Sequence, residues 1–133
     1  MEFTFTIPGV PTPMKRPRLS KSGVINPDAA KKRADKWIIA IKYRDIPNDL
    51  PVSVYIQYHM PIPRTFTKAK KEQAANNNLI HSYKPDIDNL IKHTLDVLSG
   101  IVFKDDGQVH SIVARKVYSD NPRTEIRVFF GED

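Results

Sequence analysis

The sequence predicts one small α/β or α+β domain, in which helices pack mainly on one face of a mixed β-sheet. The chain has 133 residues, about the length of a single domain with one ordinary core. Its 40% hydrophobic and 27% charged residues are typical of a soluble globular protein. Alternating and helical periodicities follow in the order strand, helix, strand, helix, strand, strand. We therefore expect one domain that spans residues 1–133.

The N-terminal third contains a strand, a loop and a helix. Residues 1–7 alternate between apolar and polar side chains, which is the period of a half-buried strand. Residues 10–27 hold four prolines among lysines and arginines, so we expect an irregular basic loop. Asn26 and Pro27 are suited to the N-cap and first turn of a helix that runs to about Tyr43.

The middle of the chain predicts a second strand and a polar excursion. Residues 52–59 alternate again, and prolines mark both ends of this segment. Residues 61–82 are rich in lysine and asparagine, and a short helix fits at 67–75. We expect this excursion to be basic and mobile.

The C-terminal part predicts the most regular helix and two further strands. Residues 86–99 have the apolar spacing of an amphipathic helix that ends at Gly100. Residues 104–107 resemble a turn, and residues 108–118 a strand whose alternation slips near Ile112, as at a β-bulge. Residues 124–130 predict the last strand.

The composition narrows the possible functions. The chain has no cysteine, which excludes disulfides, thiolate zinc sites and cysteine nucleophiles. A net charge of +6 favours a polyanionic partner. No apolar run approaches the roughly 20 residues of a membrane span, and the N-terminus lacks the features of a signal peptide. We expect a cytoplasmic protein without membrane contact, and the absence of a Gly-rich phosphate loop argues against a nucleotide cofactor.

The pair Asp86 and Asp88 stands at the start of the predicted helix 86–99. Two carboxylates there suit a hard divalent cation such as Mg²⁺, and the helix dipole stabilises their negative charge. The alternative is helix capping, which stabilises a helix by about 0.5–2 kcal/mol. Taken alone, the Asp-x-Asp pair favours capping, although two acids suggest more than a cap.

Further polar residues lie near this pair in the sequence. Lys92 and Asp96 continue from Asp88 at helical spacing, and Lys92 could bind a phosphate oxygen or form an ordinary i,i+4 ion pair. Asp105 and Asp106 precede Gly107, which also fits a hairpin turn. If one of these two acids joined the first pair, three carboxylates would complete a metal centre for phosphodiester hydrolysis.

Basic residues could hold DNA phosphates beside the acids. The candidates are four residues that lie in the N-terminal loop or just before the acid pair: Lys15, Arg16, Arg18 and Lys84. The lysines at 68–71 fit a solvated surface better. The four histidines lack metal-ligand spacing, and we expect His93 to be the one nearest the site.

Three segments together resemble the signature of the RusA family of Holliday junction resolvases. The family pattern D-x-D-N-L-x-K matches residues 86–92, D-x-L matches 96–98, and D-D-x-Q-V matches 105–109. The N-terminal half agrees only in the order and character of its elements. The segment 61–82 is longer and richer in lysine and asparagine than the family pattern, so the cleavage preference stays open.

The resemblance implies a homodimer that nicks four-way DNA junctions on two opposing strands. By resemblance, Asp86, Asp88 and Asp106 bind the catalytic Mg²⁺, for which Mn²⁺ could substitute, and Lys92 assists cleavage. Asp96, Asp105 and His93 would support the site. Two alternatives stay open: a general metal nuclease for flaps and forks, and a DNA-binding module without catalysis. An Asp-x-Asp phosphatase or glycosyltransferase fits poorly, because such enzymes need a longer run of alternating strands and helices.

Overall fold

The computed structural model describes residues 1–15, 18–25 and 29–131. It confirms a mixed sheet with helices, in the following order along the chain: β1 (Glu2–Pro8), β2 (Arg18–Ser20), β3 (Gly23–Ile25), α1 (Ala29–Lys42), β4 (Val52–Pro61), α2 (Lys68–Ala75), α3 (Ile87–Leu98), the 3₁₀ turn η1 (Asp106–Gln108), β5 (Val109–Ser119) and β6 (Arg123–Phe130).

The main sheet has the strand order β1-β6-β4-β5. The pair β4 and β5 is parallel, whereas β1 and β4 both run antiparallel to β6. A parallel pair needs a crossover connection, and here α2 and α3 lie in the chain between the two strands. Because β4 and β5 run in the same direction, the chain must return before β5 begins. The helix α3 makes this return, so it runs opposite to β5 and ends close to the start of β5.

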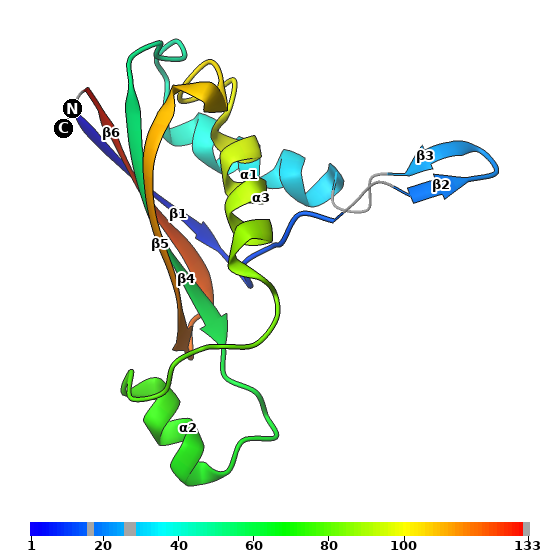
Figure 1. The fold of residues 1–133 in the computed structure, drawn as a ribbon, viewed down its shortest axis with the longest axis vertical. Helices are drawn as coiled ribbons and strands as arrows, with labels where there is room; N and C mark the ends of the chain where they lie inside the picture. The colour runs from blue at the N-terminus through cyan, green and yellow to red at the C-terminus, as the bar shows by residue number, and fades with distance from the viewer. Residues whose placement is uncertain (16–17, 26–28, 132–133) are drawn as a thin grey trace.

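Helices α1 and α3 cover one face of the sheet, as Figure 1 shows. The core lies between these layers, and its fully buried side chains include Phe5, Ile39, Val54, Leu90 and Ile126. The helix α3 buries Leu90, Val97 and Leu98 on its apolar face and stops before Gly100, whose φ of +84° suits glycine. The helical periodicity therefore placed this element correctly.

Three details differ from the sequence expectations. The basic loop contains a hairpin, β2 and β3, which stands away from the rest of the fold in Figure 1. Residues 104–107 do not form a hairpin turn, because the strand that follows pairs in parallel with β4. The irregularity of β5 lies at His110 rather than near Ile112, since Val52 and Ser53 face Val109 and Ser111. The expected capping residues Asn26 and Pro27 lie outside the described residues.

The excursion 61–82 carries the expected short helix, α2. Thr67 caps it, because its hydroxyl accepts a hydrogen bond from the Lys70 N–H at 3.2 Å. In Figure 1 this helix lies beyond the lower end of the sheet, and the chain then runs from it up to the start of α3. Among the described residues, no helix has the length and apolar character needed to cross a membrane.

Candidate active site

Asp86 and Asp88 lie at the start of α3 and are exposed. Asp86 occupies the N-cap position, with extended backbone angles of φ −66° and ψ 139°, yet its side chain makes no capping hydrogen bond. The Oδ1 atom of Asp88 accepts a hydrogen bond from the Asn89 N–H at 2.9 Å. Asp86 therefore occupies the capping position, but its carboxylate does not cap the helix and is left exposed.

Two backbone contacts anchor the start of α3. The Nζ atom of Lys116 in β5 donates to the carbonyl oxygens of Tyr83 and Pro85, at 2.6 and 2.9 Å. The Met14 N–H, in the basic segment, donates to the Asn89 carbonyl at 2.9 Å. The acid pair is thus attached to the sheet on one side and to the N-terminal segment on the other.

Lys116 was not predicted as a site residue. Lys116 is one lysine in a predicted strand, and such a residue is expected to be an exposed side chain, so the local sequence does not indicate a role at the site. Only the crossover connection brings the chain at 83–85 within its reach.

Lys92 lies one helical turn after Asp88 and is exposed. Both residues are described, and no ion pair connects them, so the i,i+4 explanation does not account for Lys92. Asp96, one turn further on, instead forms an ion pair with Lys32 of α1 at 3.1 Å. Of the three polar residues at helical spacing on α3, Asp88 and Lys92 are therefore exposed, whereas Asp96 is paired with α1.

His93 lies in the packing between α1 and α3, where it is only 3% exposed. Its Nε2 atom is 3.0 Å from Oδ2 of Asp35, and Oδ1 of Asp35 is 2.7 Å from Lys31 Nζ. Burial raises the pKa of Asp35, but the hydrogen bonds from His93 and Lys31 outweigh it and hold the pKa below its ordinary value. This buried network joins the two helices behind the acid pair. Asp35 was missed by sequence reasoning, because an acid in a basic helix resembles a surface residue.

Asp105 and Asp106 have different surroundings in the turn before β5. Asp105 caps η1: its Oδ2 accepts from the Gly107 N–H at 3.2 Å, and the Asp105 N–H donates to Gln108 Oε1 at 2.9 Å. Gln108 Nε2 donates to the carbonyl oxygens of Asn48 and Leu50. Asp105 thus shapes the turn, whereas Asp106 is exposed on it.

One chain alone does not bring Asp106 beside the other two acids. The 12 residues of α3 extend roughly 18 Å, with Asp86 at the first end. Asp106 lies near the other end, because Gly100 is hydrogen bonded to Phe103 and β5 starts only at Val109. In the described part of the chain, no three Asp, Glu or His side chains come together to hold a metal ion. The three-carboxylate site is therefore not formed within a single chain.

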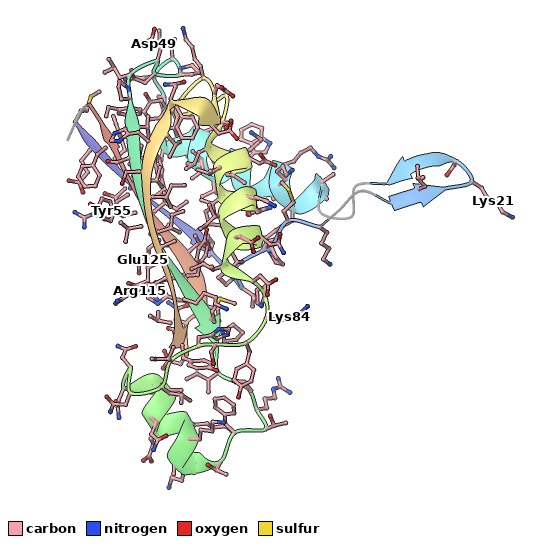
Figure 2. All side chains as sticks on the ribbon, in the orientation of Figure 1. Lys21, Asp49, Tyr55, Lys84, Arg115 and Glu125 are labelled. Carbon is pink, nitrogen blue, oxygen red and sulfur yellow. The ribbon has the colours of Figure 1, made fainter. Side chains whose placement is uncertain are left out.

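Basic side chains lie on the helix side of the fold. Lys15 and Lys84 are both exposed, and Figure 2 shows Lys84 where the chain enters α3. Figure 2 also shows Lys21 at the tip of the projecting hairpin. The backbone of Arg18 belongs to β2, the first strand of this hairpin. Arg16 lies outside the described residues. Lys84 precedes the acid pair by two residues and Lys92 follows it by one helical turn, so exposed positive charge lies on both sides of the pair along the chain, which suits a polyanionic substrate.

A groove of about 570 Å³ lies where β5 meets the start of α3. Its lining combines Ile87 of α3 with Arg115, Lys116 and Val117 of β5 and with the segment that includes His81. Burial, and then the charge of Lys116, lower the pKa of His81. The groove therefore contains an imidazole whose pKa is lowered, and it reaches Ile87, which stands between the two acids in the sequence.

Comparison with known proteins gives two findings. The family described as endodeoxyribonuclease RusA matches residues 8–129, a range that includes the acid pair, Lys92 and Asp106. The uncharacterized protein YqaN of Bacillus subtilis (strain 168) is 34% identical over 132 aligned residues, which cover 93% of each chain.

Proposed function

Because the chain belongs to the RusA family of endodeoxyribonucleases, we propose that it is a magnesium-dependent endonuclease that resolves four-way DNA junctions as a homodimer. The observation that carries this proposal is the acid pair at the start of α3. Asp86 stands at the N-cap position without capping the helix, and exposed lysines flank the pair. An exposed acid pair within a chain of net charge +6 suits a metal ion and a DNA backbone together.

The donor set fits a hard divalent cation. Asp86 and Asp88 offer carboxylate oxygens, which are the ligands that Mg²⁺ prefers, and Mg²⁺ commonly uses one or two carboxylates together with substrate phosphate. Mn²⁺ accepts the same ligands. A cation that Asp86 and Asp88 held would polarise the scissile phosphate and lower the pKa of the attacking water.

The lysines act on the DNA. Lys92 projects from the same helix as the acids and would stabilise the negative charge that develops on the phosphate during cleavage. Lys84 lies just before the start of α3, and Lys15 follows Met14, whose N–H donates to the Asn89 carbonyl of α3; both lysines would bind neighbouring phosphates. These contacts position the backbone without reading its sequence.

Asp106 would complete the site from the second subunit. Asp106 and the acid pair lie toward opposite ends of α3, whose 12 residues extend roughly 18 Å, and a two-fold axis can bring opposite ends of two subunits together. Each active site would then take Asp86 and Asp88 from one subunit and Asp106 of the partner subunit. Two such sites per dimer match the two strands that must be cut to resolve a junction.

The test is cleavage of a labelled synthetic four-way junction, beside linear duplex and flap substrates, with and without Mg²⁺. We expect paired symmetric nicks from the native protein and none from Asp88→Asn. The matched control is Asp96→Asn, because Asp96 lies on the same helix but pairs with Lys32. Equal cutting of flaps and junctions would indicate a general metal nuclease, and binding without cutting would indicate a DNA-binding module.

A further inference from the structure

The helix α1 exposes a large aromatic side chain and buries an acidic one. Its buried side chains are Asp35 and Ile39, whereas Trp37 is 70% exposed and Ile41 is 60% exposed. A surface helix ordinarily turns its large apolar side chains toward the core. The pairing with His93 explains why Asp35 is buried. The described part of the chain leaves the indole of Trp37 in solvent, so we looked for a partner that would cover it.

Trp37 lines a groove on the exposed side of α1. The groove has a volume of about 320 Å³, and its other lining residues are Arg33, Lys36, Ala40 and Ile101. Helix residues three and four positions apart share one face, so the four residues from α1 form one stripe. Ile101 lies just after the end of α3 and forms the other wall. A volume near the lower end of ligand pockets, about 300 Å³, accommodates a few side chains of a partner.

The groove is positively charged, and one of its cations is available to a partner. None of the described residues that line it is acidic. Lys36 donates to the carbonyl oxygens of Val97 and Ser99, at 3.5 and 2.9 Å, so its ammonium is already used at the end of α3. Arg33 is exposed and forms no ion pair with any described residue. A guanidinium of this kind can bind a carboxylate through two parallel hydrogen bonds.

These features fit a segment of protein better than DNA. Proteins that bind DNA strands combine a row of cations with aromatic side chains on which the bases stack. Here the indole of Trp37 has one free cation beside it, and its other neighbours on the helix include the aliphatic Ala40 and Ile41. The groove also lies at the C-terminal end of α3, where the helix dipole is negative. Tryptophan and arginine are, by contrast, the residues that most often dominate the binding energy of protein interfaces.

We propose that Trp37 and Arg33 form a docking site for a short acidic segment of another protein. An aromatic or aliphatic side chain of that segment packs on the indole, and a carboxylate pairs with the guanidinium. Charge complementarity is the argument for this occupant. A contact confined to the groove is much smaller than the roughly 800 Å² per partner of a standard interface, so the complex should be reversible.

The docking site is separate from the acid pair. The groove meets α3 beyond its last residue, whereas Asp86 and Asp88 lie at its first end. A docked segment therefore leaves the acids open to DNA. The inference does not depend on the proposed nuclease activity, because it rests on the surface of α1 alone.

Trp37 provides its own probe, since the chain contains one tryptophan. An exposed indole emits at longer wavelengths than a covered one. The native protein should therefore have the emission of an exposed indole, and a saturating four-way junction should leave that emission unchanged. The emission of a buried indole in the native protein would show that a second copy covers the groove, and quenching by the junction would show that DNA does. Either result would overturn the proposal.

The occupant can be selected from a displayed library of random peptides. We expect the native protein to enrich peptides that combine acidic residues with an aromatic or large aliphatic residue, and each such peptide to shift the emission of Trp37 to shorter wavelengths. Trp37→Ala should bind these peptides about tenfold more weakly or worse, while it cleaves the junction like the native protein. The matched control is Tyr55→Ala, because Tyr55 is 43% exposed and lies on the other side of the sheet (Figure 2).

Charge reversal tests the role of the guanidinium. Arg33→Glu should weaken peptide binding about tenfold or more, with the circular dichroism of the native protein. Lys42→Glu is the control, since Lys42 follows Arg33 by about two and a half turns of α1 and so lies on the opposite side of the helix. Peptides that lack acidic residues, or that bind Trp37→Ala as tightly as the native protein, would refute the docking site. A selection that enriches no peptide would refute it as well.

Discussion

Mixed dimers give the sharpest test of a shared active site. If Asp106 acts across the dimer, an Asp88→Asn subunit joined to an Asp106→Asn subunit contains one site with both changes and one intact site. If all three acids act within one subunit, both sites of the same mixed dimer are defective. The roughly 18 Å length of α3 between the two positions is the reason to expect the first outcome.

The expected magnitude follows from the count of intact sites. The mixed dimer should nick a four-way junction at about half the rate of the native dimer, since one of its two sites is intact. It should release few resolved products, because resolution needs a second cut on the opposing strand. The two subunits can be co-expressed with different affinity tags, purified in succession and assayed on a labelled junction.

The control is a mixed dimer of Asp86→Asn and Asp88→Asn. Both positions lie at the same end of α3, so each of its two sites has one altered acid under either arrangement, and no activity should return. An Asp88→Asn and Asp106→Asn dimer as inactive as this control would refute the shared site.

Three further predictions concern single properties. Lys92→Ala should lower the cleavage rate about 100-fold or more, with junction affinity little changed in a gel-shift assay. The control Lys32→Ala removes a lysine that pairs α1 with α3, and it should leave the cleavage rate unchanged. Asp35→Asn should destabilise the fold by about 3–5 kcal/mol in urea unfolding, because it breaks a buried pair with His93. Since the pKa of Asp35 lies below its ordinary value of 3.8, its contribution to stability is present above that pH and is lost as the pH falls through the lower folded value. In Asp35→Asn, the free energy of unfolding should therefore fall less between neutral and acidic pH than in the native protein. Junction affinity should fall steeply with salt, and Lys15→Ala and Lys84→Ala should each lower the slope of log affinity against log salt by about one; an unchanged slope would exclude phosphate contacts at these positions.

Periodicity predicted most of the secondary structure, because it depends on local patterns. The strand β1, the helices α1 and α3, and the strands β5 and β6 all lie within a few residues of the predicted ranges. The hairpin of β2 and β3 was missed because prolines in that segment favoured an irregular loop. Its strands have three residues each, too few for a periodic signal.

The surroundings of the acids were only partly predictable. The extended backbone at Asp86 is that of an ordinary N-cap residue, but whether its carboxylate caps the helix depends on the side-chain geometry. The capping role of Asp105 depends on Gln108, which in turn bonds to the loop at 48–50. Contacts between positions about 60 residues apart give no pattern in a single sequence.

The sequence by itself determined the family and most of the local elements of this protein, and it predicted the chemistry. The D-x-D-N-L-x-K and D-D-x-Q-V motifs, the lack of cysteine and the positive charge indicated a metal-dependent nuclease of the RusA family, since these are properties of residue types and their spacing. Only the tertiary structure decided where those residues lie. The parallel pairing of β4 and β5 makes α3 run its full length between the acid pair and Asp106, which separates in space the two motifs that the sequence suggested were neighbours.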